Sequence, residues 1–258
     1  MDSTTVIAED AKALAVKCWE WLSGLIRRHQ SLCQRPFALA LAGGNTPRLL
    51  YEIAGQSSNL SEPGLGPKLD WQRVILLLGD ERNVPLDHLD SNFRMVTESL
   101  LSKVSVPPQN VLAVVGAGGD PALAAKRYQE LLYDRLGSGE DGFPVIDCVL
   151  LGLGDDVHTA SLFPETLGLD EQEQAVIANY VDRLHAWRIT LSVPAINAAK
   201  QVAFLIAGCS KKSAWRTLRN GVRDGHRYPA QLILPKTGSL LFFVDQAARG
   251  ELPAQPTH

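Results

Sequence analysis

Short apolar runs alternate with amphipathic stretches along most of the chain. A fully buried strand of a parallel sheet is a nearly continuous apolar run, whereas a surface helix repeats its apolar residues every three to four positions. The clearest runs are followed by a turn and then a helical pattern. They predict strands at 37–42, 73–78, 145–151 and 201–207, with further strands at 111–115, 175–180, 188–193, 231–234 and 240–244.

Helical periodicity occurs between these runs. It predicts helices at 6–29, after Ser91, at 121–136, from Pro194 and from about 211 to Leu218. Strands that alternate with helices indicate an α/β fold, here a doubly wound, mostly parallel, Rossmann-like sheet with helices on both faces. Residues 55–70 and 137–142 are rich in loop-forming residues, and the polar, proline-rich tail from Arg249 is expected to be loosely held.

Composition narrows the function classes. The chain has 258 residues, 45% hydrophobic residues and a formal net charge of -3, which gives no sign of nucleic-acid or membrane-surface binding. The four cysteines form no C-x-x-C pair, so neither a zinc site nor a disulfide framework is expected. No secretory signal or apolar run of about 18 residues is found, and a cytoplasmic location is expected.

The segment Leu150–Pro164 carries the strongest candidate chemistry. An apolar run ends at two glycines and is followed by Asp155, Asp156 and His158. In an open α/β sheet, ligands bind beyond the carboxyl ends of the strands. His158 can exchange a proton near neutral pH, and Asp156 can orient its ring. By itself, the motif is also compatible with a solvated polar loop.

Two other strand-to-helix turns can bind an anion, and the first of them follows the run at 37–42. Gly43, Gly44, Asn45 and Thr46 follow the run at 37–42; Asn45 or Thr46 can cap the next helix, and Pro47 suits its first position. Such a turn directs backbone N–H groups toward a phosphate, although a plain turn explains the pattern equally well.

Basic side chains follow other predicted strands. Arg82 comes shortly after the run at 73–78, and its guanidinium group suits an oxyanion. Lys211 follows the strand at 201–207 and can reach a phosphate. The segment G-L-G-D-D-V lacks the third glycine of a dinucleotide fingerprint, so no nicotinamide site is expected.

Four segments together resemble the 6-phosphogluconolactonases, whose superfamily includes glucosamine-6-phosphate deaminase and ribose-5-phosphate isomerase. The resemblance spans nearly the whole chain, and T-A-S-L-F-P after the histidine resembles the lactonase branch. The segments are 42–47, 79–85 with Ser91 and Asn92, 152–164, and Gly208 with Lys211.

The resemblance implies one lactonase domain over residues 1–258, which hydrolyses 6-phosphoglucono-δ-lactone in the oxidative pentose phosphate pathway. It implies no metal or organic cofactor, with the sugar-phosphate lactone as the partner of a monomer or weak homodimer. His158 matches the general base of the family; we expect Asp156 to hold its ring and Arg82, or a backbone N–H, to stabilise the oxyanion. The positions around the sugar phosphate are matched by Gly43, Gly44, Thr46, Arg82 and Lys211, and Asn45 and Arg183 are expected to bind there as well.

Two positions depart from the family pattern. The family usually has glycine between the aspartate and the histidine, whereas this chain has Val157. A β-branched residue at positive φ is strained, so this loop is expected to be strained or shifted. The family's Lys-Pro-Pro before R-I-T-L is also missing, and Arg183 is expected to replace the charge of the lysine.

Two other functions stay open. A hexosamine-phosphate isomerase or deaminase needs a carboxylate that shuttles protons, for which Asp80 or Glu81 could serve. A non-catalytic relative would bind a sugar phosphate without turnover. Ser161 as a nucleophile is a weaker alternative mechanism, because it lacks the G-x-S-x-G elbow.

Overall fold

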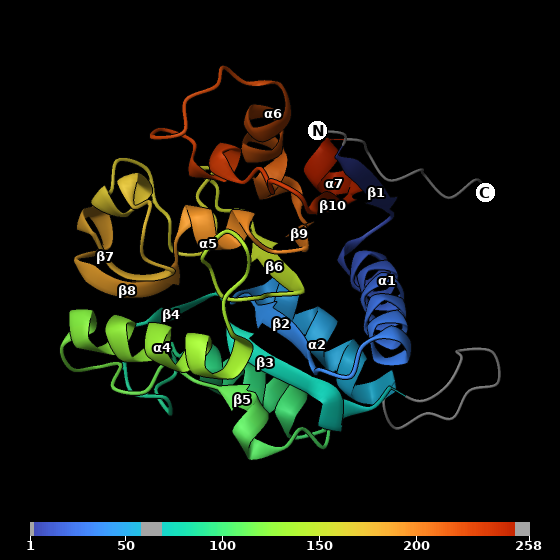
Figure 1. The fold of residues 1–258 in the computed structure, drawn as a ribbon. Helices are drawn as coiled ribbons and strands as arrows, with labels where there is room; N and C mark the ends of the chain where they lie inside the picture. The colour runs from blue at the N-terminus through green and yellow to red at the C-terminus, as the bar shows by residue number, and fades with distance from the viewer. Residues whose placement is uncertain (1–2, 58–68, 251–258) are drawn as a thin grey trace, which may run out of the picture.

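The computed structural model describes residues 3–57 and 69–250. A seven-stranded sheet, parallel throughout, crosses the molecule in the order β1-β10-β9-β6-β2-β3-β5 (Figure 1). The mostly parallel α/β sheet expected from the sequence is thereby confirmed. The strands are β1 Thr4–Ala8, β2 Phe37–Leu41, β3 Val74–Leu78, β5 Val111–Leu112, β6 Cys148–Gly152, β9 Gln201–Ile206 and β10 Ser239–Asp245.

A second, antiparallel sheet of three strands lies beside the first. It consists of β4 Asp80–Arg82, β8 Ala186–Leu191 and β7 Val176–Val181, in that order. The strands expected at 175–180 and 188–193 are therefore present, but outside the parallel sheet. Gly79 joins the two sheets: its N–H donates to the carbonyl of Leu41, and its carbonyl accepts from the N–H of Leu191.

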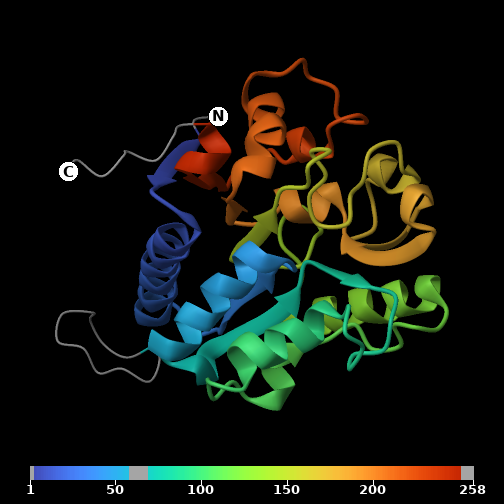
Figure 2. The same ribbon diagram turned by 180° about the vertical axis from the view of Figure 1, so that it is seen from behind.

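Helices cover both faces of the large sheet (Figure 2). Successive residues of a strand point to opposite faces, and in β10 the Phe243 ring contacts Trp21 whereas the Phe242 ring contacts Trp215. Helices α1 and α6 therefore pack on opposite faces. The helices are α1 Ala11–Leu32, α2 Asn45–Ser57, α3 Asn92–Val96, α4 Pro121–Leu136, α5 Val193–Asn197, α6 Lys212–Asn220 and α7 Gln246–Arg249.

Several local predictions need correction. Residues 4–8 form β1 rather than the start of a helix, because Asp10 caps α1 and stops it there. The strand expected at 231–234 is instead a 3-10 turn, Pro229–Leu232, opened by a proline that fixes φ. The strand expected at 111–115 is limited to Val111–Leu112. Most of the loop expected at 55–70, and the tail after 250, lie outside the described residues.

The start of α2 also differs from expectation. The N–H of Arg48 bonds to the carbonyl of Gly44, so Gly44 rather than Asn45 or Thr46 occupies the cap position. Gly44 has φ +99, a conformation that side chains with a Cβ rarely adopt. Ser91, in contrast, caps α3 as predicted, through its side-chain bond to the N–H of Arg94.

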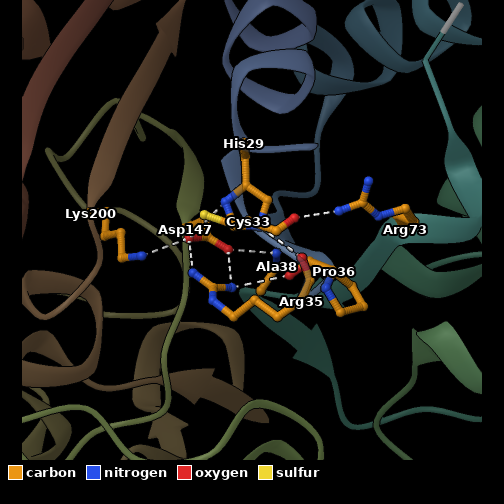
Figure 3. Close-up of polar contacts among 8 residues, drawn as sticks. All are labelled: His29, Cys33, Arg35, Pro36, Ala38, Arg73, Asp147 and Lys200. Carbon is orange, nitrogen blue, oxygen red and sulfur yellow. Dashed lines mark hydrogen bonds and ion pairs between the residues drawn. The ribbon is translucent and has the colours of Figure 1, made fainter. Parts of the chain in front are cut away.

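A buried ionic cluster lies where β2, β6 and β9 begin (Figure 3). Asp147, only 3% exposed, accepts two bonds from Arg35, at 2.6 and 2.5 Å, and one from the N–H of Ala38. Lys200 Nζ lies 3.1 Å from the same carboxylate. Burial raises the pKa of Asp147, but these bonds and charges outweigh it and hold the pKa below its usual value. The cluster therefore ties the amino ends of three strands together.

None of the helices in the described ranges has both the length and the apolar character needed to cross a membrane.

Candidate active site

A pocket of about 400 Å³ opens at the carboxyl ends of the large sheet, between this sheet and the small one. The turns after β2, β6 and β9 line one side, and the small sheet lines the other. This is the place where open α/β sheets bind ligands. All predicted site residues except Asp156 contribute to the lining: Gly43, Gly44, Asn45, Thr46, Arg82, His158, Arg183 and Lys211.

Asp156 lies behind His158 and is bonded to it. Its Oδ1 is 2.5 Å from His158 Nδ1, and it also accepts the backbone N–H of His158. Because the carboxylate accepts at Nδ1, the imidazole carries its proton there and leaves the Nε2 lone pair available. Burial would raise the pKa of Asp156, but the bonds and charge of His158, and the charge of Arg183, lower it to about 2. The pair thus has the arrangement of a general base with its orienting carboxylate.

The loop that carries this pair has tight backbone requirements. A Cβ on Gly154 would lie 1.9 Å from His158 Nδ1, so the histidine ring can occupy its position only above a glycine. Val157 has φ 66, in the left-handed region, as the missing family glycine predicted. Its side chain is nonetheless buried in the core, which offsets part of the strain.

Phe163 supports the histidine ring from the same loop. The two rings are stacked with centroids 4.0 Å apart. The guanidinium carbon of Arg183 lies over the phenyl ring, 4.9 Å from its centroid. The phenylalanine of the T-A-S-L-F-P segment therefore fixes the plane of the imidazole, a role that sequence reasoning did not assign to it.

The turn after β2 leads into the first turn of α2 at the edge of the pocket. The first N–H groups of a helix have no partner within the helix, and the positive end of its dipole points the same way. The first turn of α2, through Asn45 and Thr46, faces the pocket. A Cβ on Gly43 would lie 2.1 Å from Asn92 Oδ1, so only glycine lets α3 approach this closely. Phosphate binding at this turn stays a prediction.

The small sheet contributes a wall of arginines. Arg82 on β4 and Arg188 on β8 are cross-strand partners, and both line the pocket. Like charges placed opposite each other destabilise a sheet unless an anion compensates them. Burial, and then the charge of Arg82, lower the pKa of Arg188. Arg188 was not predicted as a site residue, although a charged residue alternating with Thr190 inside a β-rich run was an available signal.

Two basic residues of the pocket already have acidic partners. Lys211 Nζ lies 2.8 Å from Asp155 Oδ1. Arg183 Nη2 lies 2.6 Å from Asp156 Oδ2, an ion pair without the geometry of a hydrogen bond. An anionic ligand therefore meets Lys211 only in competition with Asp155.

The two other acidic candidates, Glu81 and Asp80, differ in whether they face the pocket. Glu81 is fully buried, and its two oxygens accept from Ser91 and from the N–H groups of Arg82, Asn92 and Phe93, so it serves the start of α3. Asp80 lines the pocket and accepts the hydroxyl of Ser161, 2.7 Å away. Within the described ranges, no three His, Cys, Asp or Glu side chains are arranged to hold a metal ion.

Comparisons with known proteins agree with this geometry. Residues 9–242 match the family described as glucosamine-6-phosphate isomerases/6-phosphogluconolactonase. A 6-phosphogluconolactonase of Nostoc sp. is 40% identical over 85% of this chain and 86% of its own, and one of Synechocystis sp. is 38% identical over 81% and 82%. The crystal structure of 6-phosphogluconolactonase from Leishmania guyanensis has a TM-score of 0.79 and 28% identity, covering 96% of this chain and 98% of that one.

Proposed function

This chain belongs to the family of glucosamine-6-phosphate isomerases and 6-phosphogluconolactonases, and from that premise we propose that it hydrolyses 6-phosphoglucono-δ-lactone to 6-phosphogluconate. The reaction belongs to the oxidative pentose phosphate pathway. The observation that carries the proposal is the His158–Asp156 pair, which faces a pocket lined with cationic groups. The lactonases among the relatives support the same activity.

In this mechanism, His158 Nε2 accepts a proton from a water molecule as its oxygen bonds to C1 of the lactone. Asp156 keeps the opposite nitrogen protonated and stabilises the imidazolium that forms. When the bond between C1 and the ring oxygen breaks, His158 returns the proton to that oxygen. One water is consumed, and the histidine ends in its starting state.

The negative charges of the substrate are distributed over two regions of the pocket. The tetrahedral intermediate places an oxyanion near the arginine wall, where Arg82 and Arg188 stabilise it. The phosphate binds at the turn Gly43–Thr46 together with Lys211. Holding the phosphate fixes C1 relative to His158, which lowers the entropic part of the barrier.

The isomerase or deaminase alternative has less support. Of its two candidate carboxylates, Glu81 is saturated by the start of α3, and Asp80 is engaged by Ser161. Ser161 is buried and lies on no G-x-S-x-G elbow, which disfavours it as a nucleophile. The proposal further includes a cytoplasmic location and a monomer or weak homodimer in one domain over residues 1–258.

Hydrolysis of freshly generated lactone, corrected for the spontaneous rate, tests the proposal. His158→Ala should lose about 10²- to 10⁴-fold in kcat while the unfolding transition stays cooperative. A wild-type rate equal to the spontaneous rate would reject the lactonase. Binding of 6-phosphogluconate by that inactive protein would then identify a non-catalytic sugar-phosphate-binding relative.

A further inference from the structure

We propose that Arg183 is a positioning residue, which holds Asp156 and Phe163 so that the imidazole of His158 keeps one orientation. The inference rests on the proposed function and deepens it. It assigns to Arg183 a role different from direct contact with the phosphate, and it is carried by the contacts of one side chain.

The two oxygens of Asp156 have different partners. Oδ1 lies 2.5 Å from His158 Nδ1, and Oδ2 lies 2.6 Å from Arg183 Nη2. The carboxylate is thus held between an imidazole and a guanidinium group. Rotation about its terminal bond would break both contacts, so Arg183 restricts the orientation in which Asp156 meets the histidine.

Phe163 gives Arg183 a second contact with the same unit. One ring stacks on His158 with centroids 4.0 Å apart, and the Arg183 guanidinium carbon lies 4.9 Å from the phenyl centroid. A cation over an aromatic face is attracted by the ring quadrupole. Arg183 therefore contacts both groups that orient the imidazole, although the structure gives it no bond to the imidazole itself.

The position of Arg183 follows from a hairpin. Strands β7 and β8 are joined at residues 182–185, with a 3-10 turn at Asp182–Leu184 and His185 in the left-handed conformation. This tip brings Arg183 from the small sheet to the loop after β6 on the large sheet. The hairpin thus connects the arginine wall to the proposed general base.

The charged side chains around His158 differ in their partners. Asp156 is the acidic group hydrogen-bonded to the ring, and Arg183 forms an ion pair with that carboxylate. Lys211 is paired with Asp155, and the pocket also contains Asp80, Arg82 and Arg188. Loss of the Arg183 side chain would leave Oδ2 of Asp156 without its cation, and the carboxylate that orients the imidazole would then be free to turn.

Steady-state kinetics of three variants test the role. Arg183→Gln should lower kcat by about ten- to a hundred-fold, because a misplaced base loses its alignment, with KM changed less than about three-fold. Arg183→Lys should restore most of kcat. Asp182→Asn, at the same exposed hairpin tip, is the matched control and should behave as wild type.

A direct phosphate ligand would give a different pattern. If Arg183→Gln raises KM strongly and leaves kcat unchanged, the positioning role is wrong. The double variant gives a second comparison. If Arg183 acts through Asp156, the effects of the two substitutions on kcat are not additive. The positioning role is therefore also wrong if Arg183→Gln lowers kcat as much in the Asp156→Asn variant as it does in the wild type.

A separate measurement keeps this inference distinct from the proposed activity. The ring of His158 can be observed by NMR in the protein without substrate, through its nuclear Overhauser contacts to the Phe163 ring, whose centroid lies 4.0 Å away. Arg183→Gln should weaken these contacts, whereas Asp182→Asn should not. Weakened contacts in a protein without lactonase activity would reject the proposed function alone, whereas unchanged contacts in an active enzyme would reject the role of Arg183.

Discussion

Replacement of Asp147 by asparagine should destabilise the protein without affecting the pocket. The carboxylate is 3% exposed and holds Arg35 through two contacts, at 2.6 and 2.5 Å, and Lys200 at 3.1 Å. Removal of one partner from a buried ion pair costs about 3–5 kcal/mol. The side chains of Arg35 and Lys200 are 38% and 57% exposed, so water can stabilise the cations left behind. The lower end, about 3 kcal/mol, is therefore expected.

Thermal unfolding measures this loss. For a protein of this size, about 3 kcal/mol corresponds to a decrease in Tm of roughly 6–12 °C. Glu52→Gln is the matched control, because it removes a charge from an exposed pair, that with Arg48 at 3.2 Å, and should cost less than about 0.5 kcal/mol. Lactonase activity per folded molecule should stay at the wild-type value, since Asp147 lies at the opposite end of β6 from the pocket.

The pH dependence of the difference in Tm between the wild type and Asp147→Asn gives a second check. The folded-state pKa of Asp147 is lowered, so its stabilisation is fully present above the pKa of the unfolded chain, near 3.8. It is lost as the pH falls through the still lower folded value. The gap in Tm between the wild type and Asp147→Asn should therefore be constant from about pH 5 to 8 and narrow below about pH 4. A gap no larger than that of Glu52→Gln at pH 7 would refute this account of the cluster.

Three further predictions concern single positions. Gly154→Ala should lower kcat about a hundred-fold with a cooperative unfolding transition retained, because its Cβ would lie 1.9 Å from His158 Nδ1; a wild-type kcat would contradict this geometry. Asp155→Asn should lower KM about two- to five-fold by releasing Lys211, and an unchanged KM would show that the pair at 2.8 Å does not compete with substrate. Gly24→Ala, exposed in α1 with nothing within 4 Å of its Cβ, should stabilise the protein by about 1 kcal/mol, measured as a rise in Tm of roughly 2–4 °C; a lower Tm would count against it.

The sequence predicts the large sheet well because its strands are buried on both faces. Runs such as 37–42 and 201–207 have no polar face that would interrupt the apolar pattern, and the glycines that follow mark their ends. The edge strand β1 was missed, because its five residues form no buried apolar run and lie directly before α1, where they resemble an extra helical turn. The short β4 has only three residues and no apolar run, so no local pattern indicates it.

Residues of the pocket can be predicted from the sequence where they directly follow a buried strand. They cannot be predicted where their position depends on the pairing of strands that are distant in the sequence. His158 and the turn Gly43–Thr46 follow buried strands, and the topology brings them together. Arg188 was missed because its closeness to Arg82 arises from antiparallel pairing of β4 with β8, segments more than 100 residues apart. The partner of Arg183 is not local either, since the hairpin tip places Arg183 beside Asp156.

Because Gly79 joins the two sheets, the length of the segment 79–82 is as important as its composition. Gly79 is hydrogen-bonded to both sheets, and Asp80 and Arg82 follow it on the same face of β4. Side chains of a strand alternate between faces, so one inserted or deleted residue after Gly79 would turn Arg82 away from the pocket and misalign it with Arg188. Relatives that conserve this arginine pair must therefore keep the spacing from Gly79 free of insertions and deletions, even where the residues themselves vary.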